Sequence, residues 1–366
     1  MIKVVELPID KDMGGLTSYV LQLYRYIDKK EFDLMLLTYD DIACFDDLNN
    51  VMKVDRPYQL LSFYKSMRRL VKLNYDIIHF HQSYVNIVPI LLAKLAGFNN
   101  IILHAHSSSI DDNRSLIRYL KTILHKIGKL FIPFIVDAYI GCSQKASRWM
   151  FSDKCINSDS YYLFNNSIDL DEYNKDHNKY IEMRQKLNLP KDALVVGHIG
   201  RFTPVKNHSF IISMFRKLLE MNPNSYLLLL GDGIERKKIE LLVNAQEIES
   251  NVIFMGGYVS NPVEIMQTMD VIVLPSLFEG MPLVAIESQA LGIPILLSDT
   301  ITNEVAITEL CNFLSIDDEL IWVNKILEKS HINNTCDYKN QIKAAGYDLK
   351  EAIKSVEQLY RRYYGF

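Results

Sequence analysis

The sequence has few of the residues that mark several classes of protein. Its 366 residues include only 15 Gly and 11 Pro, which excludes collagen-like and linker-like chains. The five cysteines lie far apart and form no C-x-x-C pair, so we expect a reducing compartment and no disulfide framework. Hydrophobic residues make up 49% of the chain, too many for a disordered protein. The chain is therefore globular, and its length predicts two domains.

Long apolar runs are also missing. Lys3 and Glu6 interrupt the apolar run at the N-terminus, which is therefore unlike a signal peptide. The most apolar later stretch, residues 130–136, is far shorter than the roughly 20 residues that cross a bilayer. These two features predict a cytoplasmic protein.

Charge is unevenly distributed along the chain. Residues 51–150 hold 14 Lys and Arg against 5 Asp and Glu, although the whole chain has a net charge of −4. Within this block, segments 58–73 and 113–135 mix basic and apolar side chains and predict amphipathic helices. Such helices either pack on their own core or lie on an anionic bilayer. Nucleic acid explains them less well, because no known binding module is recognisable.

Short apolar strands alternate with amphipathic helices, which predicts doubly wound parallel sheets and an α/β fold. A first series of strands runs through 2–7, 32–37, 77–81, 101–104 and 138–141, and a second through 194–199, 225–230, 252–255, 271–274 and 293–297. The polar segment 171–191 predicts a linker. We therefore expect domains at 1–188 and 189–345, and a helix in 346–366 that returns to the first domain. Ligands should bind in a cleft between the carboxyl ends of the two sets of strands.

The strongest motif follows the apolar strand at 271–274. Glu279 precedes a predicted helix that Gly280 and Pro282 open, and Glu287 lies about one turn inside it. The free N–H groups at such a helix start hold phosphate or sugar oxygens, and carboxylates accept hydrogen bonds from vicinal hydroxyls. Together these groups predict a polar ligand site.

Two further motifs follow predicted strands. Gly200-Arg201 and Lys206 place two cations around a turn, as binding of a diphosphate requires. Gly14-Gly15 lies between the first strand and the first helix, where a backbone can approach an anion closely. No G-x-G-x-x-G is present, so the nicotinamide fingerprint is missing.

Two H-x-H pairs, His79/His81 and His104/His106, end predicted strands. Alternate residues share one face of a strand, so a metal site is conceivable. No neighbouring cysteine or carboxylate in the sequence completes a ligand set. We therefore expect these histidines to line the cleft, and we expect no metal.

These motifs together resemble glycosyltransferase family 4, whose members have the two-domain GT-B architecture. The resemblance rests on Glu279/Glu287 as the E-x7-E motif, on Gly200-Arg201/Lys206 as the G-R-x4-K motif, and on the Gly231-Asp232-Gly233 turn. It spans nearly the whole chain. Ser167 stands in the segment 166–169 where the family often has Gly.

The resemblance implies roles for individual residues. Arg201 and Lys206 would bind the donor diphosphate, Glu287 the ribose hydroxyls and Glu279 the transferred sugar, with His106 near that sugar. Backbone groups would assist at Gly14, Gly15, Gly280, Met281, Pro282, Leu283 and Val284, and the base would lie at Gly231, Tyr258 and Val259. No cofactor is implied, and the cations would replace a metal at the diphosphate.

The resemblance further implies a retaining transferase that uses a nucleoside diphosphate sugar, with UDP as the expected nucleotide. The acceptor would be a saccharide on a polyprenyl diphosphate, in capsule, exopolysaccharide or O-antigen assembly at the inner face of the membrane. Two alternatives stay open: a nucleotide-sugar 2-epimerase on the same architecture, and a non-catalytic partner subunit of another transferase.

Overall fold

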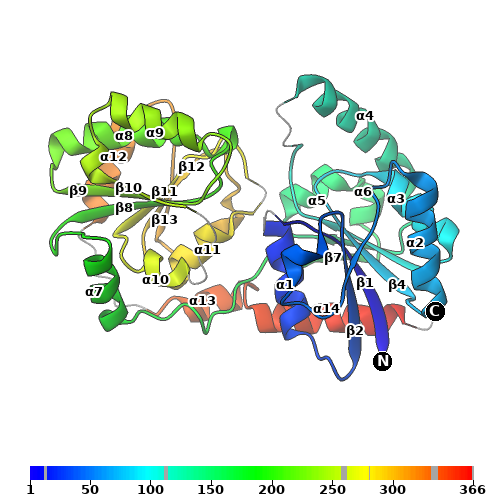
Figure 1. The fold of residues 1–366 in the computed structure, drawn as a ribbon. Helices are drawn as coiled ribbons and strands as arrows, with labels where there is room; N and C mark the ends of the chain where they lie inside the picture. Colours follow the sequence, from blue (N-terminus) through cyan, green and yellow to red (C-terminus); the bar gives the residue numbers. More distant parts are fainter. Residues whose placement is uncertain (12–14, 111–113, 257–261, 280, 331–336, 365–366) are drawn as a thin grey trace. The chain divides into compact units, whose positions relative to one another are not determined.

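The chain folds as two α/β units (Figure 1). The computed structural model describes residues 1–11, 15–110, 114–256, 262–279, 281–330 and 337–364. Unit 1 comprises Met1–Ser167 and Leu349–Phe366, and unit 2 comprises Ile168–Asp348. Each unit is built on one parallel sheet, which confirms the predicted fold class.

Unit 1 contains a seven-stranded sheet in the order β3-β2-β1-β4-β5-β6-β7. Its strands are β1 Ile2–Ile9, β2 Phe32–Thr38, β3 Val51–Lys53, β4 Ile77–Gln82, β5 Asn100–Ala105, β6 Ala138–Gly141 and β7 Tyr161–Leu163. Its α-helices are α1 Gly15–Tyr26, α2 Leu60–Lys72, α3 Ile87–Ala96, α4 Ser115–Phe131, α5 Gln144–Met150, α6 Asp153–Ile156 and α14 Leu349–Tyr363.

Unit 2 contains a six-stranded sheet in the order β10-β9-β8-β11-β12-β13. Its strands are β8 Leu194–Ile199, β9 Ser225–Leu230, β10 Val252–Met255, β11 Val271–Leu274, β12 Ile295–Ser298 and β13 Cys311–Leu314. Its α-helices are α7 His177–Lys186, α8 His208–Met221, α9 Arg236–Ala245, α10 Pro262–Met266, α11 Leu283–Ala290, α12 Glu319–Lys329 and α13 Lys339–Ala344. Figure 1 shows α8, α9 and α12 on one face of this sheet and α10 and α11 on the other.

The order of strands reverses direction once in each sheet. In unit 1 this switch point lies between β1 and β4, which pair in parallel through Val4 and Ile77. In unit 2 it lies between β8 and β11, which pair through Gly197 and Ile272. The loops that leave neighbouring strands at a switch point diverge, and the crevice between them is where doubly wound sheets bind ligands.

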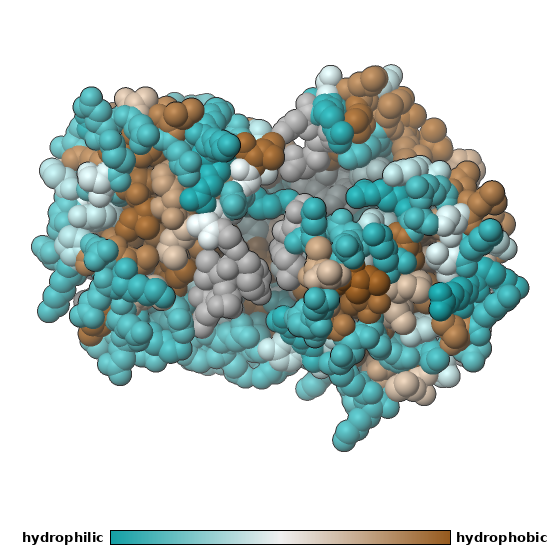
Figure 2. Space-filling view, in the orientation of Figure 1, coloured by the Kyte–Doolittle hydropathy of each residue, from teal (hydrophilic) through white to brown (hydrophobic). Residues whose placement is uncertain are grey.

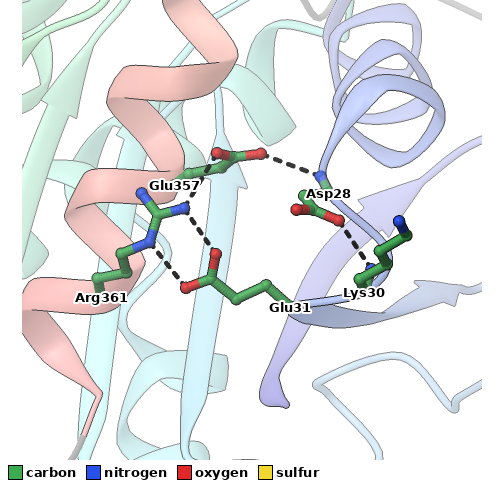
Figure 3. A network of polar contacts seen from close by, with 5 residues as sticks. All are labelled: Asp28, Lys30, Glu31, Glu357 and Arg361. Atoms are coloured by element: carbon green, nitrogen blue, oxygen red, sulfur yellow. Dashed lines mark hydrogen bonds and ion pairs between the residues drawn. The ribbon is translucent and has the colours of Figure 1, made fainter.

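Helix α14 belongs to unit 1 although it ends the chain. Its buried residues Leu349, Ile353 and Val356 join the same hydrophobic cluster as Ile2 and Phe32 of the sheet. Figure 3 shows the polar contacts that accompany this packing. Arg361 binds both carboxylate oxygens of Glu31 at 2.7 Å, and the Glu357 carboxylate accepts the backbone N–H of Asp28 at 3.0 Å. These exposed contacts contribute little stability, but they fix how the helix lies on the unit.

The division between the units falls after Ser167, earlier than the predicted position 188, and unit 2 ends at Asp348 rather than at 345. The predicted linker 171–191 is wrong, because it contains helix α7. Asp176 caps this helix by accepting the backbone N–H groups of Asn178 and Lys179, and Arg184 donates to the carbonyl of Ala193 at 2.6 Å. A segment whose composition is that of a linker is thereby tied to the sheet of unit 2.

Three short strands, β3, β7 and β13, were not predicted, because each has only three or four residues and no long apolar run. Among the helices that the structure describes, none combines the length and the apolar character that a membrane span requires. Four of the five cysteines lie among the described residues, and none of these four forms a disulfide.

Candidate functional site

Two predicted residues from different motifs meet at the switch point of unit 2. Lys206 ends a short 3-10 helix, Pro204–Lys206, after β8, and Glu279 lies in the loop after β11. The Lys206 Nζ donates to Glu279 Oε1 at 2.5 Å, and the two side chains are only 20% and 16% exposed. The backbone N–H of Leu277 donates to the carbonyl of Val205 at 2.8 Å, which ties the two loops together. A shielded cation and a carboxylate therefore occupy the crevice of the sheet.

Two glycines are required by the close packing of these loops. A Cβ at Gly200 would lie 3.2 Å from the Cδ of Lys206, so glycine leaves room for the lysine stem. Gly231 has a φ of +143°, and a Cβ there would lie 2.2 Å from the carbonyl oxygen of Gly200. A side chain at Gly231 would push the loops after β8 and β9 apart, and one at Gly200 would displace the Lys206 side chain, so the glycines hold the edge of the site in place.

Helix α11 begins at the same edge of the sheet. Pro282 is its N-cap residue, and none of the described side chains caps the first turn. The N–H groups of Leu283 and Val284 therefore point out of the helix start, where an anion binds favourably. Met281 and Pro282 are buried, and Leu283 is partly exposed. The phosphate-binding role that the resemblance gives the segment stays a prediction.

Glu287 lies on α11 and is held by a residue that the sequence analysis missed. The Tyr173 hydroxyl donates to Glu287 Oε1 at 3.0 Å. Burial raises the pKa of Glu287, and the hydrogen bond from Tyr173 lowers it again in part. Tyr173 lies 114 positions away in the sequence, within the segment first interpreted as a linker, and no motif marks it. Its hydroxyl orients a carboxylate whose expected partners are ribose hydroxyls.

We expect Tyr173→Phe to weaken UDP binding and to shift its pH dependence. The variant loses the hydrogen bond that lowers the Glu287 pKa, so this pKa rises and the carboxylate is protonated at higher pH. A protonated Glu287 accepts fewer hydrogen bonds, so UDP affinity should fall as pH falls, and it should fall earlier in the variant. Loss of one such bond predicts roughly fivefold weaker binding near neutral pH.

Calorimetric titration with UDP between pH 5 and pH 8 measures this effect. Tyr338→Phe is the matched control, because Tyr338 donates to Glu309 at 2.8 Å elsewhere in unit 2. Coincident pH profiles for Tyr173→Phe and the unaltered protein would show that Glu287 does not bind the nucleotide.

The structure describes some of the other residues predicted for the site of unit 2 and leaves others out. The Arg201 side chain is exposed beside the Lys206 loop, where it is accessible to an anion. Gly280, Tyr258 and Val259 lie outside the described residues, as does Gly14 of unit 1. The expected binding of the base at 258–259 therefore stays a prediction.

Two of the predicted residues that the structure describes, Gly15 and His106, lie in unit 1. Gly15 is the first residue of α1 and is exposed, and no described atom lies within 4 Å of a Cβ placed there. Packing against the described atoms therefore does not require glycine at this position, and its expected role at the ligand stays a prediction. His106 directly follows β5, and its Nε2 lies 2.8 Å from His81 Nδ1.

A pocket with a mixed apolar and polar lining opens at the switch point of unit 1. It has a volume of about 230 Å³ and lies next to the ends of β1 and β4. Its lining includes Asp10, Tyr39, His81, Gln82, Tyr84 and Asn86. Tyrosine rings and hydrogen-bonding side chains of this kind suit a sugar, whose two faces are apolar and whose edges carry hydroxyls.

The two H-x-H pairs form one buried cluster with a carboxylate that the sequence analysis missed. His79, His81 and His104 are fully buried, and one ring nitrogen of each lies within 4.8 Å of the others. Glu6 of β1 is also buried, and its Oε2 lies 2.7 Å from His81 Nε2. The absence of a nearby carboxylate in the sequence had argued against a metal, whereas the fold supplies one. The expectation of no metal therefore stays a prediction.

Two family models match successive parts of the chain. Residues 13–172 match the model described as Glycosyltransferase Family 4, and residues 179–319 match the one described as Glycosyl transferases group 1. The chain is 28% identical to the putative glycosyltransferase EpsF of Bacillus subtilis, over 95% of this chain and 93% of that one.

Further relatives extend the comparison. The chain is 22% identical to the UDP-Gal:alpha-D-GlcNAc-diphosphoundecaprenol alpha-1,3-galactosyltransferase of Escherichia coli, over 98% of this chain and 96% of that one. Among solved structures, Anabaena Alr3699/HepE in complex with UDP-glucose aligns with a TM-score of 0.79 at 15% identity, over 99% of this chain and 100% of that one. At this identity the structural likeness concerns the fold.

Proposed function

This chain belongs to the family 4 glycosyltransferases, and we propose that it is a retaining transferase that moves a sugar from UDP to a saccharide hydroxyl. The observation that carries the proposal is the pairing of Lys206 with Glu279 at the switch point of unit 2. A diphosphate entering that crevice meets the lysine ammonium, and the carboxylate beside it suits the hydroxyls of the attached sugar.

Stabilisation of the leaving group is the main catalytic contribution in this proposal. Negative charge develops on the diphosphate as its bond to the sugar breaks. Lys206, Arg201 and the N–H groups at the start of α11 surround the position where that charge appears, and they are in place before the reaction begins. These cations carry out the neutralisation that a metal performs in other transferases, so the proposed reaction needs no metal.

The proposed acceptor is a saccharide linked to a polyprenyl diphosphate. The Escherichia coli relative named for a diphosphoundecaprenol-linked substrate supports this choice, and so does the pocket of unit 1. Tyr39 and Tyr84 offer apolar ring surfaces to a sugar, and the Gln82 amide, which the backbone of Asn86 holds at both ends, keeps one N–H and one lone pair for it. The proposed donor, a UDP-hexose, is supported by the UDP-glucose complex of the solved neighbour.

Thermal unfolding with a panel of nucleotides and nucleotide sugars, with and without EDTA, tests the proposed donor. We expect selective stabilisation by UDP and by one UDP-sugar, with no effect of EDTA. At a ligand concentration a hundred times Kd, the free energy of unfolding should rise by about 2.7 kcal/mol. Stabilisation that EDTA abolishes would contradict the metal-independent mechanism, and the lack of any shift would favour a non-catalytic partner subunit.

We also propose that α4 binds an anionic membrane. Only His125 and Gly128 of this helix are buried, so it touches its unit along a narrow line. Its exposed apolar residues are Leu116, Tyr119, Leu120, Ile123, Ile127, Leu130 and Phe131, and Figure 2 shows hydrophobic surface gathered over it. Arg118 and Lys126 are exposed on the same helix. Apolar side chains interleaved with cations match the boundary of an anionic bilayer.

The other basic segment differs from α4. Helix α2 buries Phe63, Met67 and Leu70 against its own unit, so its apolar face has a partner. Large apolar side chains are exposed only at its two ends, at Tyr58, Leu60 and Leu61 before and at its start and at Leu73 just after it. The proposed membrane contact therefore rests on α4.

We expect the double variant Leu116→Asp/Leu120→Asp to lose binding to vesicles that contain phosphatidylglycerol. Each leucine removed forfeits about 1.5 kcal/mol of apolar burial, so affinity should fall at least tenfold. Vesicle co-sedimentation measures the effect, and Leu241→Asp, an exposed leucine on α9 of unit 2, is the control. Equal binding by the double variant and the control would contradict the assignment.

A further inference from the structure

A buried polar cluster in unit 1 connects three strands with the last helix of the chain. Glu6 lies on β1, His79 and His81 on β4, and Tyr360 on α14. All four side chains are at most 1% exposed. His106 follows β5 and contacts the cluster through His81. A carboxylate buried this deeply is tolerated only when hydrogen bonds satisfy it.

Glu6 accepts every hydrogen bond that reaches it. The Tyr360 hydroxyl donates to Oε1 at 2.5 Å, and His81 Nε2 lies 2.7 Å from Oε2. His79 Nδ1 lies 2.7 Å from the Tyr360 oxygen, which accepts from it because the hydroxyl proton is directed at Glu6, and 3.2 Å from Oε2. Burial alone raises the pKa of Glu6, but His79 and His81 outweigh it and lower the pKa to about 2. The ionised carboxylate has lone pairs and no proton, so each of its partners must donate.

Because every partner of Glu6 must donate, the position of the proton on His81 and then on His106 follows. Burial lowers the pKa of His81 to about 4 and that of His106 well below 6.5, so both rings are neutral near pH 7. His81 carries its proton on Nε2, facing Glu6, and its Nδ1 therefore has a lone pair. His106 Nε2, 2.8 Å from that lone pair, must donate to it. The proton of His106 thus sits on Nε2, and Nδ1 is left as an acceptor.

The acceptor atom has no partner in the part of the chain that the structure describes. His106 Nδ1 is buried and receives no hydrogen bond from any described residue. The Tyr19 ring packs beside His106 with centroids 5.4 Å apart, so the imidazole is also held from α1. A buried nitrogen with an unused lone pair, at the carboxyl end of a strand, is suited to accept a hydrogen bond from a ligand.

We propose that Glu6, acting through His81, is a positioning residue that holds His106 in the tautomer with a lone pair on Nδ1. This lone pair accepts a hydrogen bond from a hydroxyl group of the transferred sugar. The contact with sugar rests on the proposed function, whereas the tautomers rest on the cluster alone. The proposal implies that the sugar hydroxyl must be a donor. A donor substrate with fluorine or hydrogen in place of that hydroxyl should be transferred about tenfold more slowly.

A metal at His79, His81 and His104 would be incompatible with this arrangement. Both nitrogens of His81 already have partners, Glu6 on one side and His106 on the other. A metal ligated by His81 would break one of these contacts and disconnect His106 from Glu6. Metal content therefore separates the two interpretations of the same residues.

Nitrogen-15 NMR of the full-length protein, labelled at the histidine ring nitrogens and prepared after EDTA treatment, tests the tautomers without any substrate. We expect His81 and His106 each to be neutral and to carry the proton on Nε2 at pH 7.5, with assignments made from His106→Gln. A cationic His106, a proton on its Nδ1, or stoichiometric zinc that survives EDTA would overturn the proposal.

Glu6→Gln tests whether the tautomer matters for transfer. Glutamine has one oxygen and one NH₂ group, so it cannot accept from both Tyr360 and His81, and we expect the resonances of His106 to show mixed tautomers. The kcat should fall about tenfold while UDP affinity, which depends on unit 2, stays the same. Tyr360→Phe is the matched control, because it keeps the carboxylate and should keep the tautomers.

The outcomes distinguish this proposal from the proposed function. The expected tautomers with no turnover on any UDP-sugar would refute the proposed function and leave the assignment of the protons intact. Mixed tautomers in Glu6→Gln with unchanged kcat would refute the role of His106 Nδ1 in sugar binding. Should Glu6→Gln not fold, the fluorinated and deoxy donors test the same hydrogen bond in the unaltered protein.

Discussion

Replacement of Lys206 by alanine is expected to lower turnover at least a hundredfold. In the proposed mechanism Lys206 neutralises charge that appears on the diphosphate as the sugar leaves, and loss of one such preorganised group has an effect of this size. The free energy of unfolding should fall only by about 2 kcal/mol, because one charge-assisted hydrogen bond, to Glu279, is lost. Steady-state kinetics with a UDP-hexose and a saccharide acceptor measure the loss.

The matched control for this variant is Lys217→Ala. Lys217 of α8 pairs with Glu319 at 3.0 Å, so its removal also breaks a lysine–glutamate pair of unit 2, but one between α8 and the start of α12. We expect its kcat and KM to match those of the unaltered protein. Similar losses in both variants would show that ion pairing in general, and not the position of Lys206, determines the rate.

Replacement of Glu279 by alanine should separate binding from catalysis. Glu279 holds Lys206 in the free protein, and its carboxylate repels the diphosphate that Lys206 is expected to bind. UDP should therefore bind the variant as tightly as the unaltered protein, or more tightly. Turnover should still fall at least a hundredfold, because the group proposed to contact the transferred sugar is gone. Calorimetry with UDP and kinetics with the full donor give the two quantities.

Glu264→Ala provides the comparison for this second variant. Glu264 pairs with Lys179 at 2.7 Å on the surface of unit 2, and we expect its removal to change neither quantity. If Glu279→Ala weakened UDP binding and turnover by the same factor, Glu279 would act on the nucleotide rather than on the sugar.

Much of the fold could be predicted from sequence, because strands such as β11 and β12 are buried along their whole length and consist wholly or mostly of one uninterrupted apolar run. The boundary between the units could not be predicted from sequence. Helix α7 is polar on most of its surface, and its attachment depends on Arg184 and Lys179, which pair with Asp270 and Glu264 many positions away. Composition describes the exposed surface of such a segment and carries no information about its contacts.

The candidate site shows the same contrast. Lys206 and Glu279 could be found because each belongs to a motif of fixed spacing next to a strand. Tyr173 and Glu6 could not, because their roles come from partners brought together by the fold: Glu287 is 114 positions from Tyr173, and Tyr360 is 354 from Glu6. In sequence Glu6 only interrupts an apolar run, whereas in the structure it organises a buried cluster of histidines.

The most direct test of the central claim is a transfer assay in EDTA with a panel of UDP-hexoses and a polyprenyl-diphosphate-linked saccharide. The account predicts that one donor is consumed only when the acceptor is present, and that UDP is released. The lipid should gain one hexose, whose anomeric configuration, determined by NMR, equals that of the donor. Conversion of the donor without acceptor, or an inverted linkage, would contradict the account.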